Sequence, residues 1–118
     1  MNDNVLADRV VELGVAKRFP DEKEWWIYSL NDIGPNGQIA RQFVRDWRVA
    51  GALMEKAFTK IEGRPEIRGR IPTLIIEHSY VSVIHAYTKN GEALSASIDN
   101  FESLPRAIIE ACAEALNE

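Results

Sequence analysis

The sequence predicts an α+β protein in which a mainly antiparallel sheet is sandwiched between helices. Two capped segments with apolar residues at helical spacing, 46–61 and 103–115, predict helices. The residues between them form apolar and β-branched runs, and Asn90-Gly91 is a dipeptide typical of hairpin turns. Because these runs are apolar on both faces, we expect helices to cover both sides of the sheet. The predicted order of elements is α-β-α-β-β-β-α.

The first third of the chain predicts one helix and one strand. An asparagine or aspartate among residues 2–4 can cap a helix that runs to about Leu13, where Gly14 stops it. The aromatic and β-branched run 25–30 then predicts a strand. Residues 31–37 are rich in turn-forming side chains, so they predict the clearest loop of the chain.

Caps and breakers bound the remaining elements. Asp46 caps the second helix, and Gly63 and Pro65 end it. Three apolar runs predict strands, namely 74–76, 80–88 and 93–98. Ser103 caps the last helix, which carries Pro105 in its first turn. We expect this helix to bury one apolar stripe, made of Leu104, Ile108, Ala111, Cys112 and Ala115.

Length and composition are typical of one folded globular domain, which we expect to span residues 1–118. Hydrophobic residues make up 46% of the chain and charged residues 27%, which is too apolar for a disordered chain. No apolar run approaches the roughly 20 residues of a membrane-spanning helix, and residues 1–4 lack the pattern of a signal peptide. We therefore expect a cytoplasmic protein without a membrane partner. Cys112 is the only cysteine, which excludes an internal disulfide.

Charge and aromatic residues suggest a protein-binding surface. Residues 41–70 contain eight basic and four acidic residues, although the whole chain has a net charge of −4. Exposed tryptophan beside arginine is the composition of an interface hot spot, and arginine binds carboxylate or phosphate in a bidentate manner. The candidate binding residues are Trp25, Arg45, Trp47, Arg48, Arg68 and Arg70.

The usual catalytic patterns are missing from the sequence. His78 and His85 are the only histidines, and a metal site would need Glu77 or Asp99 without any recognisable ligand spacing. His78 and Ser79 cannot form a catalytic pair on a strand, because neighbouring side chains point to opposite faces. The glycines fit neither a P-loop nor a dinucleotide fingerprint. We therefore predict no catalytic residue, no metal and no cofactor.

Nucleic acid is a disfavoured partner. The order α-β-β-β-α from Asp46 onward is also the order of a double-stranded RNA-binding domain, which contacts phosphates with basic residues at the start of its last helix. In this chain that helix carries Arg106 against Glu110, Glu114 and Glu118. The helix that should be basic is thus mainly acidic.

Three segments resemble a known family. The strings Asp-Trp-Arg-Val-Ala-Gly-Ala-Leu-Met-Glu-Lys at 46–56, Ser-Leu-Pro-Arg-Ala-Ile-Ile-Glu-Ala at 103–111 and Leu-Ala-Asp-Arg-Val-Val-Glu-Leu-Gly-Val at 6–15 are similar to the phage ABA-sandwich domain family. This resemblance implies a sandwich fold and a phage or prophage origin. It implies no catalytic residues.

Two functions remain open. The first is a phage- or prophage-encoded, non-enzymatic accessory protein that binds a host protein or complex, for example as an inhibitor of a defence system such as CRISPR-Cas. Pairing through an exposed edge strand would also give a homodimer. The alternative is a small-molecule-binding domain or small enzyme with a pocket between sheet and helices, near Trp26, Tyr28, His85 and Tyr87.

Overall fold

The computed structural model describes residues 1–20, 26–31, 37–64 and 72–117. The helices in this part of the chain are α1 (Asp3–Glu12), α2 (Ala40–Phe43), α3 (Trp47–Glu62) and α4 (Leu104–Ala115). The strands are β1 (Ala16–Pro20), β2 (Trp26–Leu30), β3 (Gln38–Ile39), β4 (Thr73–Glu77), β5 (Tyr80–Tyr87) and β6 (Ala93–Asp99). All four strand pairings are antiparallel. The predicted α+β class and antiparallel pairing are confirmed.

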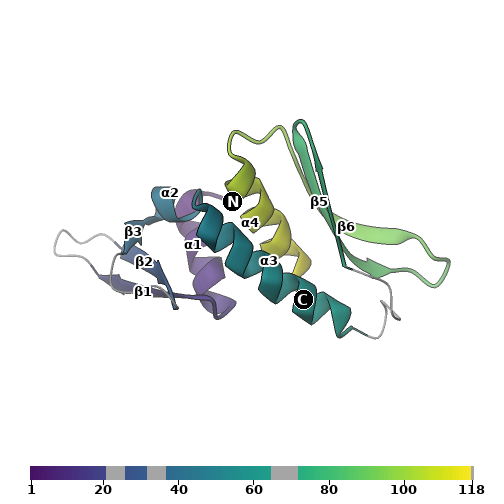
Figure 1. Ribbon diagram of the computed structural model, residues 1–118, viewed down its shortest axis with the longest axis horizontal. Helices are drawn as coiled ribbons and strands as arrows, with labels where there is room; N and C mark the ends of the chain where they lie inside the picture. Colours follow the sequence, from purple (N-terminus) through teal and green to yellow (C-terminus); the bar gives the residue numbers. More distant parts are fainter. Residues whose placement is uncertain (21–25, 32–36, 65–71, 118) are drawn as a thin grey trace.

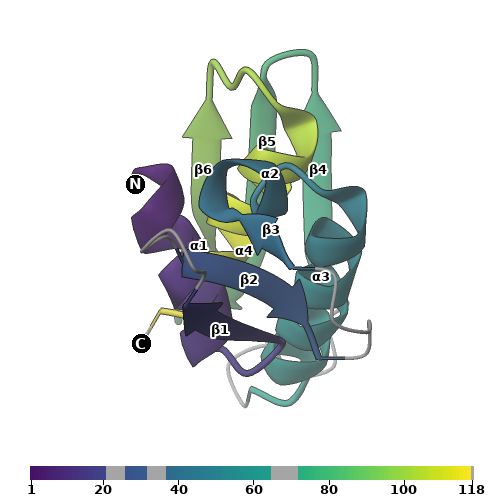
Figure 2. The same cartoon turned by 90° about the vertical axis from the view of Figure 1, so that its left-hand side faces the viewer.

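The layer order differs from the predicted one, because the helices lie between two sheets. One three-stranded sheet has the order β1-β2-β3 and the other the order β4-β5-β6. Figure 1 shows the two sheets towards opposite ends of the long axis, with the helices between them. The same arrangement is seen end-on in Figure 2, where the first sheet is nearest the viewer. The prediction of a single sheet sandwiched between helices is therefore wrong.

Burial of α4 explains this layer order. The residues expected to face inward do so, because Ile108, Ala111, Cys112 and Ala115 are buried and Leu104 packs against the core. Nine of the twelve residues of α4 are buried, however, so its buried surface is wider than the single stripe that was expected. The helix contacts α3 on one side and both β5 and β6 on another. Small side chains such as Ala107 and Ala113, each 1% exposed, make a further face of the helix apolar. A helix that is apolar nearly all round needs neighbours on more than one side.

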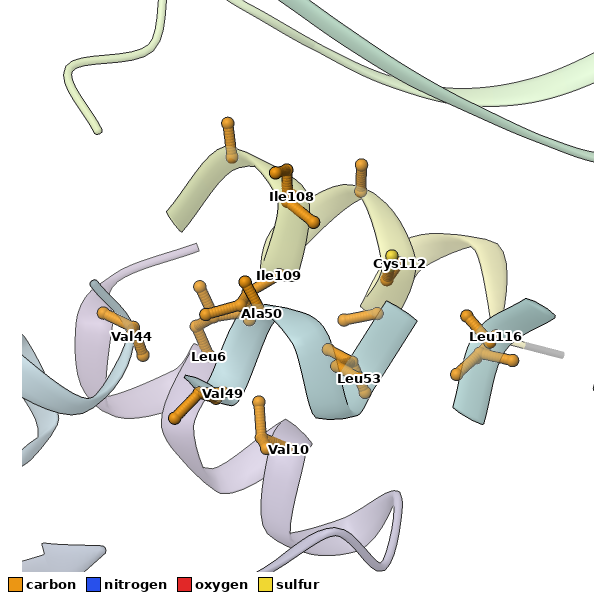
Figure 3. Packing of buried hydrophobic residues seen from close by; sticks show 14 of the residues in the cluster. Leu6, Val10, Val44, Val49, Ala50, Leu53, Ile108, Ile109, Cys112 and Leu116 are labelled. Atoms are coloured by element: carbon orange, nitrogen blue, oxygen red, sulfur yellow. The ribbon is translucent and has the colours of Figure 1, made fainter. Parts of the chain in front are cut away.

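One cluster of buried side chains joins the helices. Leu6 and Val10 from α1 and Leu53 from α3 are fully buried together with Ile109 from α4. Figure 3 shows Ile109 beside the other helices, whereas Ile108 lies on the side of α4 that faces the second sheet. The helical layer is thus filled with aliphatic side chains.

The predicted caps are confirmed at the start of each long helix. The side chain of Asn2 accepts a hydrogen bond from the Val5 amide at 2.8 Å, and Ser103 caps α4 in the same way. At the end of α1, Gly14 has a φ of +87°, a conformation that a side chain would strain. Local sequence therefore set the helix boundaries.

Three short elements were not predicted, namely β1, α2 and β3. β1 carries polar residues and is mostly exposed, so it lacks an apolar pattern. The predicted hairpin turn at Asn90-Gly91 forms. Only Gly91 of the two has a positive φ, so the turn is not of type I′, the type that this dipeptide usually favours. Pro65 and residues 32–36 of the predicted loop lie outside the described residues.

None of the helices in the described ranges is long and apolar enough to cross a membrane.

Two glycines give a matched test of the packing. A Cβ at Gly37 would clash with Cγ2 of Ile27 and lie 2.9 Å from Cζ of Phe19, whereas a Cβ at Gly51 in α3 would meet nothing within 4 Å. We expect Gly37→Ala to lower the free energy of unfolding by about 1–3 kcal/mol. Gly51→Ala should raise it by about 0.5–1 kcal/mol, because alanine favours the helix. Urea denaturation measures both, and changes of the same sign would contradict this packing.

Candidate protein-binding surface

The first turn of α3 is held by its own cap. The Asp46 carboxylate accepts a hydrogen bond from the Arg48 amide at 2.8 Å. The Arg48 guanidinium turns back to the same carboxylate, with Nη2 at 2.7 Å from Oδ2. These hydrogen bonds from Arg48 lower the pKa of Asp46. At neutral pH the cap is therefore a charged pair that orients the start of the helix.

Trp47 is the most exposed large hydrophobic residue in the described part of the chain. It is the first residue of α3 and 60% of its surface is accessible. Its neighbour Arg48 is also exposed. The structure thus places a solvent-exposed indole ring next to Arg48, whose guanidinium is held by Asp46.

A groove lies beside this helix start. Gln38, Ile39, Arg41, Gln42, Arg45 and Asp46 line it. We call the residues Arg41, Gln42, Asp46, Trp47 and Arg48 the Trp47 surface. Arg41 and Gln42 come from α2, a helix that the sequence did not predict, so pattern alone missed their place in the groove that ends at Asp46.

Arg45 is half-buried and its guanidinium is held by hydrogen bonds within the molecule. Its Nη1 donates to Oδ2 of Asp3 at 3.1 Å and to the carbonyl of Arg41 at 2.8 Å. Asp3 also accepts a hydrogen bond from Nε of Arg106 at 2.8 Å, and Arg106 donates to Glu110 at 3.0 Å. Partial burial opposes ionisation of Asp3, but the hydrogen bonds from both arginines keep its pKa below the ordinary value. Arg45 therefore joins α1 to the turn before α3 and positions the Trp47 surface.

The other candidate residues cannot be placed on this surface. Trp25, Arg68 and Arg70 lie outside the described residues.

Trp26, the other tryptophan in the described residues, belongs to a separate cluster on the first sheet. It is 47% exposed, and the Arg18 guanidinium carbon lies 4.0 Å from the centre of its ring. Arg18 and the hydroxyl of Tyr28 both donate to Asp8, at 2.9 and 2.7 Å. Burial, together with the hydrogen bond to Asp8, raises the pKa of Tyr28 to about 12. The polar groups of this cluster therefore hydrogen-bond to one another.

No metal-binding cluster is found among the described residues. No three His, Cys, Asp or Glu side chains within these ranges are close enough to hold an ion. His78 lies in the turn before β5 and His85 near its other end, about 20 Å away at the rise of a strand. Burial, followed by the charge of Arg64, lowers the pKa of His85, so this imidazole is neutral at pH 7.

The residues named for a small-molecule pocket are not brought together. Trp26 and Tyr28 lie on β2 in the first sheet, whereas His85 and Tyr87 lie on β5 in the second, across the helical layer. A different groove runs between α3 and the end of the first sheet, lined by Gly14, Val15, Leu30, Asn31, Ala52, Glu55, Lys56, Thr59 and Lys60. Both signs of charge line that groove, without a histidine or cysteine.

No family model, curated protein or solved structure matches this chain. The physical arrangement of its own residues therefore carries the functional argument.

The contacts of Arg106 give a test of the network that positions this surface. We expect Arg106→Ala to lower the free energy of unfolding by about 2 kcal/mol at pH 7. The reason is that Asp3 and Glu110 both lose the mostly buried guanidinium that they share. Arg41→Ala removes an exposed arginine and should change stability by less than about 0.5 kcal/mol.

The effect of Arg106→Ala on the free energy of unfolding should depend on pH. The pKa of Asp3 is lowered in the folded state, so the contribution of its carboxylate to stability is present above the ordinary pKa of 3.8 and is lost as the pH falls below that value. Urea denaturation at pH 7 and pH 3 should therefore show a smaller effect of Arg106→Ala at pH 3. An equal loss at both values would contradict a role for ionised Asp3.

Proposed function

We propose that this chain is a non-enzymatic accessory protein that binds a host protein or protein complex through the Trp47 surface. The resemblance to the phage ABA-sandwich domain family supports a phage or prophage origin. In that setting the protein would act as an inhibitor of a host defence complex such as a CRISPR-Cas system. This role requires a surface that binds the partner and does not require the protein to catalyse a reaction.

The exposure of Trp47 carries this proposal. A tryptophan that is 60% accessible leaves a large apolar area in water, and burying it against a partner contributes several times the energy of an average contact. The cap at Asp46 fixes the first helical turn, so little conformational freedom is lost on binding. An exposed aromatic side chain on a fixed helical turn is what an interface anchor requires.

The charges around Trp47 indicate the chemistry of the partner. Arg41 and Arg48 are exposed on this surface, and Asp46 is its one acidic group. Arg48 already shares its charge with Asp46, whereas the side chain of Arg41 extends the basic character along α2. A partner face with an apolar pocket and flanking carboxylates would complement this arrangement.

Trp47 and Trp26, the exposed tryptophans in the described ranges, supply a matched pair of variants. Immobilised wild type, Trp47→Ala and Trp26→Ala would each be used to capture proteins from a lysate of the host bacterium, with quantitative mass spectrometry as the readout. We expect wild type and Trp26→Ala to capture the same protein in stoichiometric amounts. Trp47→Ala should weaken its binding by at least about 30-fold, the loss typical of a hot spot.

Circular dichroism is the folding control for both variants, because truncating an exposed side chain changes stability little. Equal capture by Trp47→Ala and wild type would overturn the proposed surface. Capture of no protein, with a small molecule that co-purifies with the wild-type chain, would favour the small-molecule alternative.

A further inference from the structure

β4 is an edge strand of the second sheet. Among the described residues it pairs only with β5, which lies between β4 and β6. Figure 2 shows β4 at one side of this sheet, and Figure 1 shows the sheet at the opposite end of the molecule from β1, β2 and β3. Backbone amides and carbonyls on the outer side of an edge strand can pair with another strand.

The side chains of β4 do not protect this edge. Its three central residues are Leu74, Ile75 and Ile76, and the two isoleucines are 36% and 48% exposed. Glu77 is the only charged residue of the strand and lies at its end. Exposed edges of monomeric proteins usually carry a central charge, a proline or a bulge, and the centre of β4 has none of these.

We propose that β4 pairs antiparallel with β4 of a second copy of this chain, which joins the two outer sheets into one six-stranded sheet. A two-fold axis through Ile75 gives this pairing its register. Leu74 then lies opposite Ile76 of the other copy, and Ile75 lies opposite its own equivalent. Glu77 faces position 73, which is an uncharged threonine. No like charges meet across the edge.

The faces of the strand also match in this register. Leu74 and Ile76 pair with Val83 and Val81, which are fully buried beneath α4 and its neighbours. An antiparallel pair with its two-fold axis perpendicular to the sheet keeps both helical layers on the same side. The Leu74 and Ile76 side chains of both copies would therefore form one apolar row and bury Ile76, which is half exposed in a single copy.

The outer face of the same sheet is a poorer candidate for the contact. Ser97 donates to Ser82 at 3.0 Å, and it lies 3.2 Å from the Tyr80 hydroxyl and 3.5 Å from the Ser95 hydroxyl. These polar side chains hydrogen-bond to one another, and polar side chains are typical of a sheet face in contact with water. The β6 edge has small residues at its centre, from Ser95 to Ser97, and offers less apolar area than β4.

The proposed contact between the two β4 strands is small, so the affinity of the dimer should be low. Five paired residues span about 17 Å at the rise of a strand. A contact of this length buries less area than an average stable interface. We therefore expect a weak dimer with a dissociation constant in the micromolar range. The Trp47 surface lies at the start of α3, away from the second sheet, so both copies would keep it accessible.

Charge substitutions on the two edges test the proposal. Sedimentation equilibrium of the wild type from about 5 to 500 µM should show a shift from the 13.3 kDa monomer to a dimer. Ile75→Lys places two ammonium groups opposite each other and should weaken the dimer at least tenfold. Ser95→Lys adds the same charge to the outer face of the other edge strand and should leave the dimer unchanged.

Three results would overturn the proposal. They are a wild type that remains monomeric at 500 µM, a dimer that only Ser95→Lys disrupts, and a dimer that both variants disrupt, since the last would point to packing of the outer faces. Hydrogen exchange of the wild type is independent of any effect of the variants on folding. Those amides of residues 74–76 that point away from β5 should exchange more slowly as the concentration rises, and a rate that is the same at all concentrations would also overturn the pairing.

Discussion

Burial of α4 on several sides is the constraint on which the rest of the structure depends. Its small and aliphatic residues contact α3 on one side and β5 and β6 on another, so the helix cannot lie on a surface. The one buried carboxylate of this helix, Glu110, is compensated by Arg106 and by the amine of Met1 at 3.1 Å. A buried charge without such partners would cost several kcal/mol. The polar network therefore allows α4 to occupy the centre, and the two sheets are displaced to the ends.

This architecture places the functional candidates on the outside of an elongated body. Aliphatic side chains fill the helical layer, and the protein measures 53 Å along its longest axis. The Trp47 surface and the β4 edge lie on different parts of that body, so one can bind a partner while the other pairs with a second copy. A dimer would carry two Trp47 surfaces, and two linked contacts bind a multivalent target far more tightly than one.

Local sequence predicted the elements better than it predicted their assembly. Asp46, Ser103 and the glycine after α1 set helix boundaries because capping depends on neighbouring residues alone. The short elements β1, α2 and β3 escaped prediction because tertiary contacts stabilise them, such as the stacking of Tyr28 on Phe43 at 5.5 Å. Alanines on α4 fit either a solvent-facing or a buried side, so the sequence pattern did not show that this helix packs on several sides, and the predicted layer order was wrong. The sequence named Trp47 as a candidate binding residue, but the exposure of its side chain and the hydrogen bond from Arg45 to Asp3 depend on tertiary structure that the sequence pattern does not show.

Thiol reactivity around α4 tests the central position of this helix most directly. Cys112 is fully buried and burial raises its pKa to about 12, so it should react with a thiol reagent only when the protein unfolds. In a Cys112→Ala background, Ala113→Cys should be equally protected, because position 113 is 1% exposed and lies beside α1, whereas Glu114→Cys should react at once. Protection at both 112 and 113 is the result that this structure predicts. Labelling of position 113 as fast as position 114 would show that α4 is open to solvent where this structure packs it, and would contradict the central position of the helix.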